Sequence, residues 1–160
     1  CDWSSDVCSS DLDRGILHVE MKLTPEGPRV IEVNARMGGV YVRDWVLKVW
    51  GVDMVEEGFM AAVSIPGTPY KSPSPLTHLE GRFLIPEASG VLEALDTAPG
   101  FKDDPGLYEL RRMIKPGTAV RVPPDGNDRV GMLTAQGRSA KEAEANLARL
   151  EGSVTMSVKR

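Results

Sequence analysis

The chain has 160 residues, of which 41% are hydrophobic and 26% charged, and its formal net charge is −4. This composition is typical of a globular protein, and the length allows one modest domain or a piece of something larger. The charge gives no indication of a nucleic-acid or membrane partner, and no apolar run approaches the roughly 18 residues that a membrane span requires.

Residues 1–12, CDWSSDVCSSDL, contain both cysteines and three aspartates without a compensating cation. They resemble the in-frame translation of a short-read sequencing adapter, so we interpret them as an artefact on a truncated gene product. A genuine polar N-terminal segment is the alternative. Leaving out Asp2, Asp6 and Asp11 changes the formal charge from −4 to −1, and no thiol remains. Disulfides, thiolate metal sites and cysteine nucleophiles are then excluded, which favours a reducing cytoplasm.

Two alternating segments flank a turn sequence early in the chain. In residues 15–22 and 29–36, apolar residues alternate with polar ones, which predicts two β-strands. The intervening TPEGP contains Gly27, a residue suited to a positive φ angle, and predicts a tight turn. If residues 25–27 form a three-residue loop, the cross-strand pairs are Glu20–Glu32, His18–Asn34 and Lys22–Val30.

Two short helices are predicted after this hairpin, over residues 41–50 and 53–63, because apolar residues recur there at helical spacing. Gly51 is a predicted helix end and Asp53 a predicted N-cap. The following IPGTPYKSPSP, residues 65–75, is rich in proline, glycine and serine. This stretch predicts a linker or exposed loop.

The second half of the chain predicts mostly antiparallel sheet. Strand-like runs separated by turn signals occupy residues 78–84, 90–95, 108–114, 119–122 and 129–135. Ser139 and Glu142 match a capping box and predict a helix over 139–151, before a last strand over 153–159. The predicted fold class is α+β, with a metal-bearing hairpin and helices in residues 13–64, a linker in 65–75 and a β-rich subdomain in 76–160.

The predicted hairpin places two carboxylates, Glu20 and Glu32, opposite each other. Cross-strand Cβ atoms are about 5 Å apart, and like charges at that distance destabilise a sheet unless a cation lies between them. Two carboxylates and the amide oxygen of Asn34 form a hard oxygen donor set suited to Mg²⁺ or Mn²⁺, with other positions left for water or phosphate. Arg36 could bind an anion bidentately, and Gly38 and Gly39 allow close backbone approach.

Each feature alone has a simpler interpretation. A Glu-x-Asn-x-Arg on a strand is more often a solvated face, two glycines after a strand are often only a turn, and His18 is more often a surface residue than a ligand. The conjunction of a facing glutamate, a matched register and Arg-x-Gly-Gly favours a site for a metal and a nucleotide.

These residues resemble the ATP-grasp carboxylate-amine ligases, in which a glutamate on one strand precedes a second strand that carries Glu-x-Asn-x-Arg. Glu20 and EVNAR (residues 32–36) occupy those places here. The segment IEVNARMGGVYVRDW most resembles the branch that contains carnosine synthase and bacterial L-amino-acid ligases. The resemblance covers residues 15 to about 51 and implies the C-terminal part of an ATP-grasp fold.

The resemblance implies an activity and the residues that perform it. ATP would be the cofactor, with two Mg²⁺ or Mn²⁺ ions, and an acyl phosphate formed from ATP would be captured by an amine to give an amide bond. The implied site residues are Arg36 as the catalytic group, Glu20, Glu32 and Asn34 as metal ligands, and Gly38, Gly39, Asp44 and His18 as substrate contacts.

In that family the lysines that bind the α and β phosphates and the adenine pocket lie upstream of the metal-bearing strands, so we expect this chain alone to be inactive. Dipeptide formation in the cytoplasm, from small amino-acid substrates and ATP, is the expected activity, and a homo-oligomer is left open. The alternatives are a ligase of the biotin-carboxylase or peptidoglycan-precursor type, or a noncatalytic β-rich binding domain.

Overall fold

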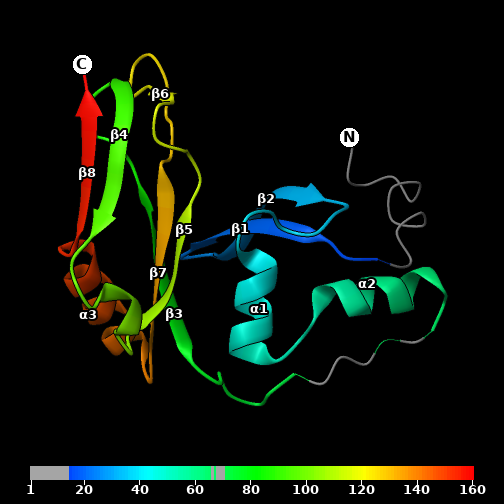
Figure 1. Cartoon of the computed structure of the whole chain (residues 1–160). Helices are drawn as coiled ribbons and strands as arrows, with labels where there is room; N and C mark the ends of the chain where they lie inside the picture. The colour runs from blue at the N-terminus through cyan, green and yellow to red at the C-terminus, as the bar shows by residue number, and fades with distance from the viewer. Residues whose placement is uncertain (1–14, 66, 68–70) are drawn as a thin grey trace. The chain divides into compact units, whose positions relative to one another are not determined.

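A computed structural model describes residues 15–65, 67 and 71–160 (Figure 1). The segment interpreted as adapter-derived, residues 1–12, lies outside this range. The chain divides into two compact units, of which the first ends at Leu76 and the second comprises Thr77–Arg160.

The first unit begins with an antiparallel hairpin of β1 (His18–Thr24) and β2 (Gly27–Asn34). The predicted three-residue loop is wrong, because Thr24 pairs with Gly27 and only two residues form the turn. Gly27 has the expected positive φ of 106°. The register then shifts between Glu20 and Met21, where Ile31 is the extra residue of a β-bulge on β2.

The β-bulge determines which of the predicted cross-strand pairs form. Glu20 pairs with Glu32 and His18 with Asn34, as predicted, because the extra residue in β2 compensates for the shorter turn. Between the bulge and the turn, the shorter turn shifts the register by one residue, so Lys22 pairs with Arg29 and not with Val30.

Two helices follow the hairpin, α1 (Val42–Trp50) and α2 (Met54–Ala62). Gly51 ends α1 in the left-handed conformation at φ 75°, with its N–H donating to the carbonyl of Leu47. Asp53 caps α2, its carboxylate accepting from the N–H of Val55 at 2.9 Å. Both predicted helix boundaries are therefore confirmed by backbone conformation and hydrogen bonding.

The described residues of the predicted linker form no helix or strand. The chain returns to the end of α1, where the N–H of Ser72 donates to the carbonyl of Trp50 at 3.2 Å. The Lys71 ammonium lies 4.7 Å from the centre of a Trp50 ring, a cation–π distance. The N–H of Leu76, the last residue of the first unit, donates to the carbonyl of Val49 at 2.9 Å.

The second unit contains two three-stranded antiparallel sheets, of order β3-β7-β5 and β6-β4-β8 (Figure 1). Their strands are β3 (His78–Leu84), β4 (Gly90–Thr97), β5 (Leu107–Arg112), β6 (Ala119–Val120), β7 (Gly131–Gly137) and β8 (Val154–Lys159). A short 3-10 turn, Phe101–Asp103, which the sequence did not predict, follows β4. All six strands were predicted to within a few residues.

Helix α3 (Ala140–Glu151) packs on β7 and β3 and closes the core of the second unit. The Ser139 hydroxyl accepts from the N–H of Glu142, as a capping box requires, but the Glu142 carboxylate accepts from the N–H of Arg138, one residue further back. The buried core comprises Leu84, Leu92, Leu95, Phe101, Val120, Val130, Leu133, Ala135, Leu147 and Leu150.

The predicted fold class is therefore confirmed, with antiparallel sheets, covering helices and a β-rich C-terminal part. Among the described residues, no helix combines the length and apolar character needed to cross a membrane.

Candidate functional site

The predicted metal ligands Glu20, Glu32 and Asn34 lie on one face of the β1-β2 hairpin. Directly paired residues of an antiparallel sheet point to the same side, so the Glu20 and Glu32 side chains emerge together, next to the pair His18 and Asn34. Both glutamates are exposed, whereas His18 and Asn34 are half-buried. The hairpin therefore places four of the predicted site residues on one surface.

His18 and Asn34 each have a buried side-chain nitrogen without a hydrogen-bond partner, Nδ1 of His18 and Nδ2 of Asn34. Buried polar atoms are normally hydrogen-bonded, because leaving one unpaired costs about 1–3 kcal/mol. These two atoms lie on one cross-strand pair. A further polar group is therefore expected to bind at this end of the hairpin face.

The residues on this face fit a divalent cation as a partial ligand set. Within the described ranges, no three His, Cys, Asp or Glu side chains cluster closely enough to hold a metal ion. Glu20, Glu32 and the amide oxygen of Asn34 supply up to three protein oxygens, which suits Mg²⁺, a cation that usually keeps several waters or phosphate oxygens as ligands. The donor chemistry fits the predicted ions, although the remaining ligands must come from elsewhere.

Sequence reasoning missed one feature of the same face. Because the register is shifted below the bulge, Lys22 and Arg29 form a cationic pair that follows the carboxylate pair along the hairpin. The signal was the break in alternation at Val30-Ile31, two consecutive apolar residues that a regular strand with one buried face would not contain. Arg29 is thus an additional candidate for contact with an anionic ligand.

The residues after β2 form the second part of the predicted site. Arg36 is exposed, and its Nη1 donates to the carbonyl of Met37 at 3.0 Å. A Cβ atom at Gly38 would lie 2.9 Å from Cγ1 of Val42, so packing against α1 requires glycine there, whereas Gly39 has open space around it. Only Gly39 of the two therefore leaves room for close approach of a ligand.

Asp44 lies in the first turn of α1, with Oδ1 3.8 Å from Nη1 of the neighbouring Arg43. Arg43 in turn reaches Asp53, and its Nη2 donates to Oδ2 at 2.9 Å. The backbone N–H of Val55 first, and the Arg43 guanidinium second, lower the pKa of Asp53 below its ordinary value of 3.8. Arg43 therefore links the start of α1 to the start of α2, a role that the sequence did not predict.

The second unit is similar to a domain of known proteins. A family profile described as L-amino acid ligase C-terminal domain 2 matches residues 82–159. Carnosine synthase 1 of Homo sapiens is 47% identical over 139 residues, which cover 83% of this chain and 16% of that protein. The chain thus spans about one sixth of the length of this curated relative.

Solved structures of low sequence identity share the fold. The L-amino acid ligase from Bacillus licheniformis matches with a TM-score of 0.76 at 21% identity, covering 96% of this chain and 38% of that one. The phosphoribosylglycinamide synthetase from Anaerococcus prevotii matches with a TM-score of 0.68 at 17% identity, covering 89% of this chain and 37% of that one. The solved structures show the fold, and together with the family profile and the human relative they support a fragment of an ATP-grasp ligase.

Proposed function

We propose that this chain supplies the metal-binding hairpin of an ATP-dependent ligase that joins an amino acid carboxylate to an amine. The observation that carries the proposal is the pairing of Glu20 with Glu32, next to His18 with Asn34, on one face of β1 and β2. Facing carboxylates are unfavourable in a bare sheet, and a bound cation removes that cost. Similarity to L-amino acid ligases and to carnosine synthase supports the choice of reaction.

In this proposal Glu20, Glu32 and Asn34 would hold the Mg²⁺ or Mn²⁺ ions. The ions supply neutralisation of the triphosphate charge when they are bound. The substrate carboxylate attacks the γ-phosphorus of ATP, the bond to the ADP oxygen breaks, and an acyl phosphate forms. Arg36 binds the transferred phosphoryl group through its guanidinium N–H groups.

The acyl phosphate then reacts with the second substrate. The amine attacks the acyl carbon, inorganic phosphate leaves, and the amine loses a proton, so that an amide bond remains. Gly39 and the start of α1 with Asp44 are the proposed contacts for the substrates, and Gly38 contributes through its packing against Val42. A dipeptide product of the carnosine type, a cytoplasmic location and small-molecule partners complete the proposal, as does inactivity of the 160-residue chain alone.

Metal binding by the 160-residue chain tests the proposal. Titration with Mn²⁺, followed by electron paramagnetic resonance, should show binding that Mg²⁺ competes away. Glu32→Gln should weaken Mn²⁺ binding about tenfold or more, because it removes one charged ligand from a small donor set. The matched control Glu56→Gln, an exposed glutamate of α2, should leave it unchanged.

Two outcomes would argue against the proposal. Equal Mn²⁺ binding by the parent chain and by Glu32→Gln would favour a noncatalytic β-rich binding domain. Loss of Mn²⁺ binding in Glu56→Gln to the same extent would indicate that the ion binds to surface carboxylates in general.

A further inference from the structure

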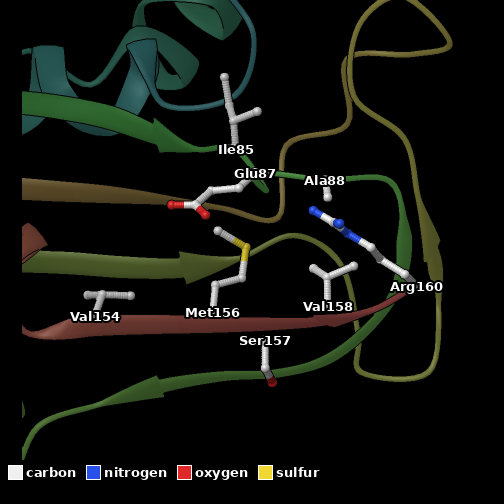
Figure 2. A pocket seen from close by; sticks show the side chains of 8 residues that line it. All are labelled: Ile85, Glu87, Ala88, Val154, Met156, Ser157, Val158 and Arg160. Carbon is white, nitrogen blue, oxygen red and sulfur yellow. The ribbon is translucent and has the colours of Figure 1, made fainter.

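The second unit contains a hollow bordered by strand β8 and the segment that follows β3. Both β8 and β3 are edge strands of their sheets. The hollow has a volume of about 480 Å³, and its lining includes Ile85, Glu87, Ala88, Met156, Val158 and Arg160 (Figure 2). None of the predicted metal or substrate residues belongs to it.

One wall of the hollow is apolar because it is the inward face of β8. Val154, Met156 and Val158 pack against the buried core and are only partly covered. In Figure 2, Met156 and Val158 point from β8 toward the segment that carries Glu87 and Ala88. The hollow therefore offers apolar surface at a place where the core of the unit is open to solvent.

Two opposite charges line the same hollow without neutralising each other. Neither the Glu87 carboxylate nor the Arg160 guanidinium forms an ion pair or hydrogen bond with any residue in the described part of the chain. Nearby, by contrast, Arg82 and Glu151 form an ion pair at 2.6 Å. Glu87 and Arg160 are thus free to pair with a ligand that carries both signs of charge.

We propose that this hollow binds the zwitterion of a free α-amino acid with an apolar side chain. The ligand carboxylate would bind the guanidinium of Arg160, the ammonium would bind the carboxylate of Glu87, and the side chain would cover Met156 and Val158. The volume of about 480 Å³ lies within the usual range for small-molecule sites. Arginine forms two parallel hydrogen bonds with a carboxylate, which gives this pairing its direction. The inference does not rest on the proposed function.

Leucine and two of its derivatives test the site on the 160-residue chain. Heteronuclear NMR titration of ¹⁵N-labelled chain with L-leucine should give saturable shifts at the amides of residues 87–88 and 156–160. Leucinamide lacks the carboxylate and N-acetyl-leucine lacks the ammonium. Each should bind about tenfold more weakly than leucine, because one charge-assisted pairing is lost.

Two variants assign each charge to its partner. Arg160→Gln should weaken the binding of leucine and of N-acetyl-leucine about tenfold and leave the binding of leucinamide nearly unchanged. Glu87→Gln should weaken the binding of leucine and of leucinamide and leave the binding of N-acetyl-leucine nearly unchanged. Both residues are exposed, so neither change should affect folding. Glu93→Gln and Arg138→Gln, exposed and outside the hollow, are the matched controls.

Three results would overturn the proposal. The first is absence of saturable shifts at residues 87–88 and 156–160. The second is unchanged affinity for all three ligands in Glu87→Gln and Arg160→Gln. The third is tighter binding of the dipeptide Leu-Leu than of leucine, which would identify the ligand as a peptide.

Discussion

The two units of the chain differ in how they bury apolar surface. The second unit has a cluster of ten buried hydrophobic residues beneath its sheets and α3. In the described residues of the first unit, Ser72, which is 9% exposed, is the only buried one, and α1 and α2 have none. Met21 and Leu23 on β1 are 53% and 83% exposed. The candidate site thus lies on the unit that has no closed core of its own.

This difference teaches where stability and chemistry reside in the chain. A two-stranded hairpin is marginally stable alone, because it needs a covering layer to bury its apolar face. Here that face, formed by Val19, Met21, Leu23 and Val30, stays exposed. We therefore expect the second unit to unfold cooperatively and the hairpin to open locally at lower cost.

The largest expected effect comes from a cavity in the second unit. Leu133→Ala, at a core residue with 0% exposure, should lower the free energy of unfolding of that unit by about 2–5 kcal/mol. Leu23→Ala, the matched leucine of the hairpin, should change stability by less than about 0.5 kcal/mol. NMR-resolved urea titration measures both, and Trp45 and Trp50 fluorescence reports the first unit. Similar losses for the two variants would remove the contrast between the units.

Most of the fold could be predicted from local signals. Gly51, Asp53 and Ser139 mark helix ends through the backbone groups that they satisfy, and the structure confirms all three. The hairpin turn could not be predicted in the same way. Both a two-residue and a three-residue turn fit TPEGP, and only the bulge at Ile31 restores the pairing of Glu20 with Glu32. Part of the predicted register was therefore right although the turn length was wrong.

A second, smaller effect is expected at low pH, because one carboxylate among the described residues of each unit has a lowered pKa. A hydrogen bond from the Arg149 guanidinium, and then one from the N–H of Gly106, lower the pKa of Asp104 below 3.8. In the first unit, the N–H of Val55 and then Arg43 do the same for Asp53. Because the folded state prefers the charged form, each contribution is present above the ordinary carboxyl pKa of 3.8 and is lost as pH falls through the folded-state pKa.

Asparagine variants test this pH dependence unit by unit. Asp104→Asn should reduce the decrease in the free energy of unfolding at low pH in the second unit only. Asp53→Asn should have the same effect in the first unit only. NMR-resolved urea titrations between pH 2.5 and 6, a range chosen to bracket the ordinary carboxyl pKa, measure both. Asp96→Asn, an exposed aspartate of β4, is the control. If one variant weakened the pH dependence of the free energy of unfolding in both units, the units would not unfold separately.

The candidate site was only partly predictable because its distant contacts leave little signal in the sequence. The alternation of charged residues was sufficient to place Glu20 beside Glu32. The link from Arg43 to Asp53 spans ten positions and two helices, so nothing local indicated it. The hollow at β8 also left no local signal, because Glu87 and Arg160, which both line it, are brought together only by the fold. Local patterns predict faces and ends of elements, whereas contacts between elements need the fold.

The smallest expected effect concerns the facing carboxylates themselves. Glu32→Gln removes a like-charge cross-strand pair, so in the absence of metal it should stabilise the hairpin by about 0.2–1 kcal/mol. Amide hydrogen exchange in β1 and β2 should slow by up to about fivefold, the factor that corresponds to 1 kcal/mol. Mn²⁺ should reverse the order, since only the parent chain gains protection from the ion. The control Glu56→Gln should leave exchange in the hairpin unchanged in both conditions, and faster exchange in metal-free Glu32→Gln would contradict the electrostatic account of this pair.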